Sequence, residues 1–200
     1  MRFNKKLQLL ILLVCSSCGY TLQRSNNDVL TEMGIRKIYV APVKNMSFKP
    51  GVENILYNEL LKMVAASRRL EIVEKPEYAD VVLNGRVDSA AYSPSATTSS
   101  DSVFGGVNNS PKTIQMIVAT EYQAALNFSL SLMRNQGVGA PKKEIWGSSY
   151  ARTKRFPSNI QKVEYGTTSQ LISESNFDRV LKEMAHATMI EVQESMLSLF

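Results

Sequence analysis

The chain has 200 residues, of which 44% are hydrophobic, which is enough for one globular domain with its own core or for two small ones. Its formal charge of +5 overstates its basicity, because Arg2, Lys5 and Lys6 lie in a segment that we expect to be removed, leaving 20 basic against 18 acidic residues. This near balance removes the main support for general nucleic-acid binding, and we predict no nucleic-acid partner.

The N-terminal segment has the pattern of a bacterial lipoprotein signal. Three basic residues precede the almost wholly apolar run 7–14, which is much shorter than the about 20 residues of a membrane-spanning helix. Small residues then lead into Cys18, as at the cleavage site of a secreted protein. We therefore predict a signal peptide over residues 1–17 and acylation, as by palmitate, of a new N-terminal Cys18. An ordinary secreted protein with a free cysteine is the alternative.

The cysteine and histidine counts exclude several kinds of catalytic site. Cys15 and Cys18 are the only cysteines, and after cleavage the single remaining sulfur is a thioether, so no disulfide, thiolate metal site or cysteine nucleophile remains. His186 is the only histidine and lies between two alanines in a helical pattern, where a structural or surface role is far more common than a catalytic one. We predict no enzyme activity, no metal and no cofactor.

The first half of the predicted domain follows a tether at residues 18–34. Residues 36–43 are rich in β-branched and aromatic side chains and predict a strand. Pro50 suits the first turn of a helix, and apolar residues then recur with a 3.6-residue period up to Val64. Two short strands should follow, at 70–73 and 79–87.

Residues 93–112 are rich in serine, glycine and asparagine and predict a mobile loop. They precede the clearest strand of the sequence, in which polar and apolar residues alternate from Glu121 to Leu132. One face of this strand should lie on the core. The other face is polar but nearly uncharged, so we expect it to meet a partner through these residues: Glu121, Gln123, Asn127, Ser129 and Ser131.

The last third predicts a hairpin partner and a helix. Residues 145–156 should form the returning strand, and residues 157–173 a second polar linker. From Glu174 onward the apolar residues share one helical stripe, and its methionines should lie in the core. Residues 35–200 are therefore predicted to form an α+β two-layer sandwich, with a mostly antiparallel four- to five-stranded sheet and two helices on one face.

Several features occur in a characteristic order along the chain. They are Cys18-Gly19-Tyr20 at the mature start, a strand over residues 35–45, Pro50-Gly51 opening an amphipathic helix, the segments 69–73 and 79–85, and then the long strand, hairpin and C-terminal helix. In this order they resemble the lipopolysaccharide-assembly lipoprotein family LptE. The resemblance implies a periplasm-facing outer-membrane lipoprotein whose small α/β domain sits inside the β-barrel LptD, the pair moving lipopolysaccharide into the outer leaflet.

The resemblance also implies a lipid ligand that carries phosphates. Cations on a sheet edge or hairpin can bind phosphate through charge-assisted hydrogen bonds, although most exposed basic residues are simply solvated. The candidates for lipopolysaccharide binding are Arg134, Lys142, Lys143, Arg152 and Lys154, with Arg86 and Arg155 as further possibilities.

Other classes of envelope lipoprotein remain open. Lipoproteins that activate a cell-wall synthase, or that form part of a secretion pore, also begin with a modified cysteine and a similar strand before a helix. A lipoprotein hydrolase is disfavoured by the lack of thiol and histidine chemistry.

Overall fold

The structure is a computed structural model that describes residues 33–104, 112–135, 143–158 and 168–198, without the side chains of residues 100–104, 112–118, 168–172 and 197–198. The predicted signal peptide at 1–17, Cys18 and the tether up to residue 32 lie outside the described residues, as does Lys142.

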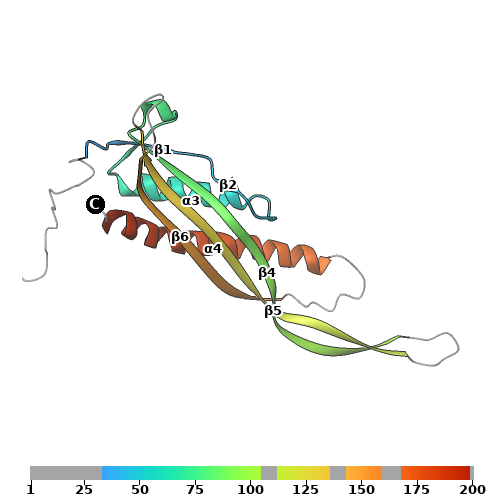
Figure 1. Ribbon diagram of the computed structural model, residues 1–200. Helices are drawn as coiled ribbons and strands as arrows, with labels where there is room; N and C mark the ends of the chain where they lie inside the picture. Colours follow the sequence, from blue (N-terminus) through green and yellow to red (C-terminus); the bar gives the residue numbers. More distant parts are fainter. Residues whose placement is uncertain (1–32, 105–111, 136–142, 159–167, 199–200) are drawn as a thin grey trace, which may run out of the picture.

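The described residues form two layers, a twisted sheet and a pair of helices (Figure 1). In chain order the elements are β1 (Lys37–Val40), β2 (Lys44–Asn45), α3 (Val52–Ser67), β3 (Glu71–Ile72), the 3-10 helix η1 (Pro76–Tyr78), β4 (Val81–Phe104), β5 (Lys112–Arg134), β6 (Lys143–Pro157) and α4 (Thr168–Ser198). The strand order is β3-β1-β4-β5-β6, and β2 pairs with β4. The predicted α+β two-layer class is confirmed.

The sheet has six strands and is mixed, whereas the sequence predicted four or five mostly antiparallel strands. The long strands β4, β5 and β6 are antiparallel, but β1 pairs in parallel with both β3 and β4. The parallel pair of β1 and β3 arises because α3 crosses over between them, which returns the chain in the same direction.

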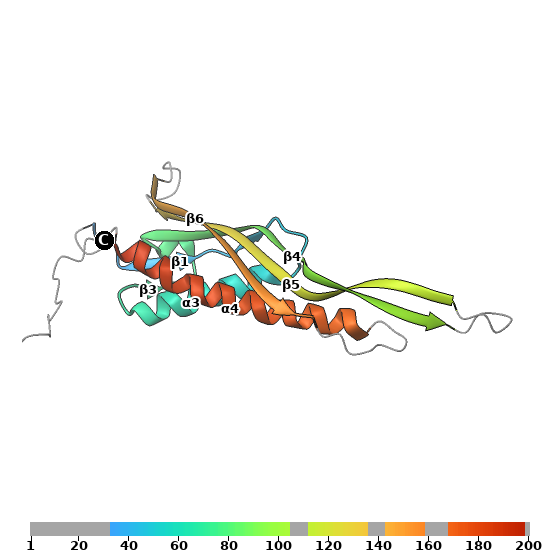
Figure 2. The ribbon, with the colours of Figure 1, turned by 90° about the horizontal axis from the view of Figure 1, so that it is seen from below.

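The alternation of β5 separates the two faces of the sheet as predicted. Its apolar positions, from Ala124 to Leu132, are buried and belong to one core with residues of both helices. Successive side chains of a strand point to opposite faces, so the polar positions of β5 lie on the face away from the helices. Figures 1 and 2 show both helices on one side of the long strands.

Gly85 allows Val43, in the segment between β1 and β2, to approach β4 closely. A Cβ at this position would lie 3.0 Å from Cγ2 of Val43 and 3.6 Å from Cδ1 of Leu60 on α3. The first distance is shorter than ordinary van der Waals contact, so an added methyl group would displace its neighbours.

We expect Gly85→Ala to destabilise the domain by about 1–3 kcal/mol, the usual cost of overpacking a core. Val43→Ala in the same chain should recover part of this loss, because it removes the methyl group that the new Cβ meets. Urea unfolding of the two single variants and the double variant measures both effects. A Gly85→Ala variant as stable as the wild type would contradict the packing argument.

The serine-rich segment is largely strand, so the prediction of a loop over residues 93–112 was wrong for residues 93–104 and 112. Here β4 continues to Phe104 and pairs with β5 from Ser93↔Gln123 to Phe104↔Lys112. Figures 1 and 2 show this ribbon projecting beyond the helices. Serine and threonine tolerate extended backbone when a neighbouring strand supplies hydrogen bonds, which composition alone does not reveal. Similarly, α4 begins at Thr168, inside the predicted linker at 157–173.

Candidate functional site: the uncovered face of the long strands

The polar face of β5 lies at the centre of a sheet surface that neither helix covers. Glu121, Gln123, Asn127, Ser129 and Ser131 are all half-buried, although they point away from the core. Their burial comes from neighbours on β4 and β6, which flank β5 on both sides. The structure thus brings all five predicted partner-facing residues onto one continuous surface.

The strand register shows that this surface is built from small side chains. Ser131 lies between Asn84 and Gly147, Ser129 between Arg86 and Ser149, Asn127 between Ser89 and Ala151, and Ala125 between Ala91 and Thr153. Asn127 donates a 2.7 Å hydrogen bond from Nδ2 to Oγ of Ser89, which holds the amide against the sheet. The result is a low surface of hydroxyl, amide and methyl groups.

Two charged pairs lie on this surface, one of them beside Ser129. Arg86 contacts Asp88 at 2.7 Å, and Arg155 lies 4.0 Å from Glu121. Such exposed pairs contribute little to stability, but they give each of these two arginines a carboxylate nearby. A surface of this kind can be covered by another polar wall without desolvating an unpaired ion.

The basic candidates do not gather at one point. Arg152 and Lys154 lie on the helix side of β6, where Arg152 pairs with Glu191 and Lys154 contacts Glu183 of α4 at 2.8 Å. Along β6 they alternate with Gly147, Ser149 and Thr153, which lie on the uncovered face. This two-residue alternation was present in the sequence and indicates on which face of the sheet each side chain lies.

Two other candidates lie at one end of the sheet. Arg134 and Lys143 are register partners there, and Arg134 donates a hydrogen bond to the carbonyl oxygen of Met33 at 2.9 Å. Both side chains are exposed. Whether any of these cations binds lipopolysaccharide stays a prediction.

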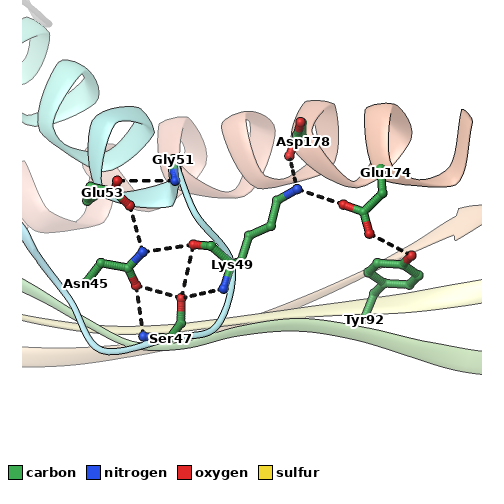
Figure 3. A network of polar contacts seen from close by, with 8 residues as sticks. All are labelled: Asn45, Ser47, Lys49, Gly51, Glu53, Tyr92, Glu174 and Asp178. Carbon is green, nitrogen blue, oxygen red and sulfur yellow. Dashed lines mark hydrogen bonds and ion pairs between the residues drawn. The ribbon is translucent and has the colours of Figure 1, made fainter. Parts of the chain in front are cut away.

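A polar network that the sequence analysis did not identify holds the loop between β2 and α3 (Figure 3). Asn45 is its centre: its amide nitrogen donates to the carbonyl oxygen of Lys49 at 2.8 Å and to Glu53 at 2.7 Å, and its amide oxygen accepts from the backbone N–H of Ser47 at 2.9 Å. The residues Asn45-Met46-Ser47, which are typical of a turn, are the only local signal for it, since the partner groups come together through folding.

Lys49 ties the same loop to α4 and to the sheet. Its Nζ lies 2.8 Å from both Glu174 and Asp178, and Glu174 accepts a hydrogen bond from the Tyr92 hydroxyl at 3.0 Å. Burial alone would lower the pKa of Lys49, but the hydrogen bonds and the attraction of the two carboxylates outweigh it and raise the pKa. The hydrogen bond from Lys49 in turn lowers the pKa of Glu174.

His186 connects the two helices. Its Nδ1 lies 3.0 Å from Oε2 of Glu59, and the other carboxylate oxygen of Glu59, Oε1, lies 2.6 Å from Nζ of Lys62. Burial would raise the pKa of Glu59, but these two partners lower it overall. No group of three or more metal-ligating side chains occurs in the part of the chain that the structure describes. Neither of its helices has an apolar run sufficient to cross a membrane.

Comparison with known proteins identifies one family. The family model named LptE, described as lipopolysaccharide-assembly, matches residues 35–189, which is most of the chain. No curated protein sequence matches it.

Similar solved structures include a putative neuraminyllactose-binding hemagglutinin homologue from Helicobacter pylori, with a TM-score of 0.46 and 11% identity over 80% of this chain and 81% of that chain. A minor lipoprotein from Acinetobacter baumannii has a TM-score of 0.42 and 12% identity over 81% and 93%. Rare lipoprotein B from Shewanella oneidensis has a TM-score of 0.38 and 10% identity over 80% and 94%. At these scores the likenesses carry no argument about function.

Proposed function

This chain belongs to the LptE family of lipopolysaccharide-assembly lipoproteins, and from that membership we propose that it is anchored through Cys18 in the outer membrane, sits inside the β-barrel LptD and assists the insertion of lipopolysaccharide into the outer leaflet. The mature domain faces the periplasm. The protein acts by binding and positioning, without catalysis.

The uncovered face of the long strands is the observation that supports this proposal most. A free, solvated sheet face ordinarily carries many lysine and glutamate side chains. Here the middle of the face consists of serine, alanine, glycine, threonine and two asparagines, and its one arginine, Arg86, is paired with Asp88. The lumen of a membrane β-barrel is polar, so a small-residue polar face is suited to lie against it.

Capture of the partner from detergent-solubilised outer membranes tests the proposal. Full-length protein produced in its own bacterium should retain LptD, and Cys18→Ser should lose acyl labelling and membrane association. A single acyl chain binds membranes only weakly, so stable anchoring needs the multiple acylation of a lipoprotein. Retention of a cell-wall synthase, or of a ring of identical copies, would instead support the alternative classes.

The basic residues should act separately from the barrel contact. We expect neutralisation of Lys142, Lys143, Arg152 and Lys154 to weaken lipopolysaccharide binding while sparing capture of LptD. The loss should be larger at low salt, where the attraction between charges is least screened. Binding of the purified variants to immobilised lipopolysaccharide at two salt concentrations measures it.

Variants that replace only some of the four basic residues show which of them contribute to lipopolysaccharide binding. Arg152 and Lys154 already pair with carboxylates of α4, so replacing them also releases Glu191 and leaves Glu183 paired with Arg179. Neutralising only Lys142 and Lys143 avoids this change, and Lys182→Ser on the exposed side of α4 removes a cation outside the set. Equal lipopolysaccharide binding by the wild type and the four-residue variant would contradict the assignment.

A further inference from the structure

The loop between β2 and α3 carries two large apolar side chains in water. The exposed fraction is 105% for Phe48 and 69% for Met46, the two highest values among the large hydrophobic residues whose side chains are described. A single exposed apolar residue needs no explanation, but two at one loop tip, one of them aromatic, form a compact apolar projection. We call residues 46–48 the apolar tip.

The apolar tip is held rigidly, although its side chains touch little. On one side, the backbone N–H of Met46 donates to the carbonyl oxygen of Val87 on β4 at 2.9 Å. On the other, the backbone N–H of Lys49 donates to Oγ of Ser47 at 3.3 Å, and the Lys49 side chain contacts two carboxylates of α4. Figure 3 shows the contacts of Lys49 with Ser47 and with the two carboxylates of α4.

Rigidity of this kind favours a role in binding. Ordering a loop and a large side chain on binding costs conformational entropy, which weakens the affinity. A loop that is already ordered in the free protein avoids this cost, so it binds its partner more tightly. Buried aromatic anchors surrounded by polar groups are the usual sites of strong contribution in protein interfaces. Ser47 and Lys49 flank Phe48 in the chain, so polar residues stand on both sides of it along the loop.

We propose that the apolar tip inserts Phe48 into an apolar pocket on the wall of the β-barrel partner. The inference rests on the proposed function, because it assigns a second contact to the same partner. The uncovered sheet face provides the broad polar contact, and the tip provides one apolar anchor that sets the position of the domain.

A protein pocket suits the apolar tip better than a lipid surface for two reasons. Lys44 and Lys49 are the only cations between residues 44 and 54, and Lys49 is already shared between two carboxylates, so the tip offers no surplus of positive charge to anionic headgroups. The predicted tether precedes residue 33, where the described chain begins, and Figures 1 and 2 show this blue first segment towards the other end of the domain from the β2–α3 loop.

Competition for the barrel tests the inference. Wild-type protein and Phe48→Ser, carrying different tags, are produced together with LptD, and the ratio of the two in the captured complex gives their relative affinity. We expect the wild type to be favoured about 30-fold, as for a strong interface anchor. Tyr78→Ser removes another exposed aromatic ring, 65% exposed on η1, and should compete equally with the wild type.

Two further variants separate the explanations. Asn45→Ala keeps Phe48 but loosens the loop, and it should compete about threefold less well, because ordering the loop then counts against binding. Flotation with vesicles containing anionic phospholipid should give the same result for the wild type and Phe48→Ser.

The outcomes are distinct. Wild-type capture of LptD with equal competition by Phe48→Ser would overturn this inference and leave the proposed function standing. No capture by the wild type would overturn both. Reduced vesicle binding by Phe48→Ser with unchanged competition would assign the tip to the membrane and also overturn the inference.

Discussion

Lysine at both Asn127 and Ser129 should weaken capture of LptD about 100-fold or more, the largest effect that we expect on binding. An unpaired charge left in a desolvated interface costs several kcal/mol, and each 1.4 kcal/mol corresponds to a factor of ten in affinity. Both positions lie at the centre of the uncovered face, where the register neighbours are small except Arg86, which is paired with Asp88. Competition with tagged wild-type protein for LptD measures the loss.

The matched control adds the same charge elsewhere. Ala65 and Ala187 are exposed on α3 and α4, so Ala65→Lys combined with Ala187→Lys raises the net charge equally without altering the sheet face. This variant should bind LptD as the wild type does. The face variant should remain folded in isolation, because both of its lysines can reach water there. If the two variants bound LptD equally well, the uncovered face would not be the contact.

Phe128→Ala should cause the largest loss of stability, about 3–5 kcal/mol, which is typical of removing a buried phenylalanine. Phe128 is 1% exposed at the centre of β5, and its ring stacks on Tyr150 of β6 at a centroid distance of 5.3 Å. Removing it leaves a cavity beneath the middle of the uncovered face. Urea unfolding followed by circular dichroism gives the change in the free energy of unfolding.

Phe48→Ala is the natural comparison for this loss. It deletes the same atoms from a side chain that is 105% exposed, so the free energy of unfolding should change by less than about 0.5 kcal/mol. Together the two variants separate the stabilising role of a phenylalanine from a binding role. A similar small effect for both would show that the core does not depend on Phe128.

The alternation of β5 shows which features of the fold the periodicity of the sequence can predict. It correctly assigned Leu126, Phe128 and Leu130 to the core and Asn127 and Ser129 to the opposite face. This was possible because a two-residue period depends only on local backbone geometry. The helix after Glu174 followed from periodicity in the same way, although its first turns, in which four of residues 168–173 are polar, were missed.

Contacts between distant segments could not be read in this way. The pairing of Arg152 with Glu191 and of Lys154 with Glu183 depends on where α4 crosses β6. The network at Asn45 joins β2, α3 and α4. Two of its members, Lys49 and Glu174, are more than 120 residues apart along the chain. No pattern in the nearby sequence predicts that Phe48 is exposed or that its loop is held in place, because both depend on that network.

The sequence by itself therefore determined the two-layer class, the inward and outward faces of β5 and the resemblance to LptE, because these depend on local periodicity and on the order of segments. The tertiary structure alone decided the parallel pairing of β1, the extension of β4 through the serine-rich segment and the position of the apolar tip. Each of these depends on which distant strand or helix satisfies a backbone or side-chain group, and that choice is made by the packing of the whole domain.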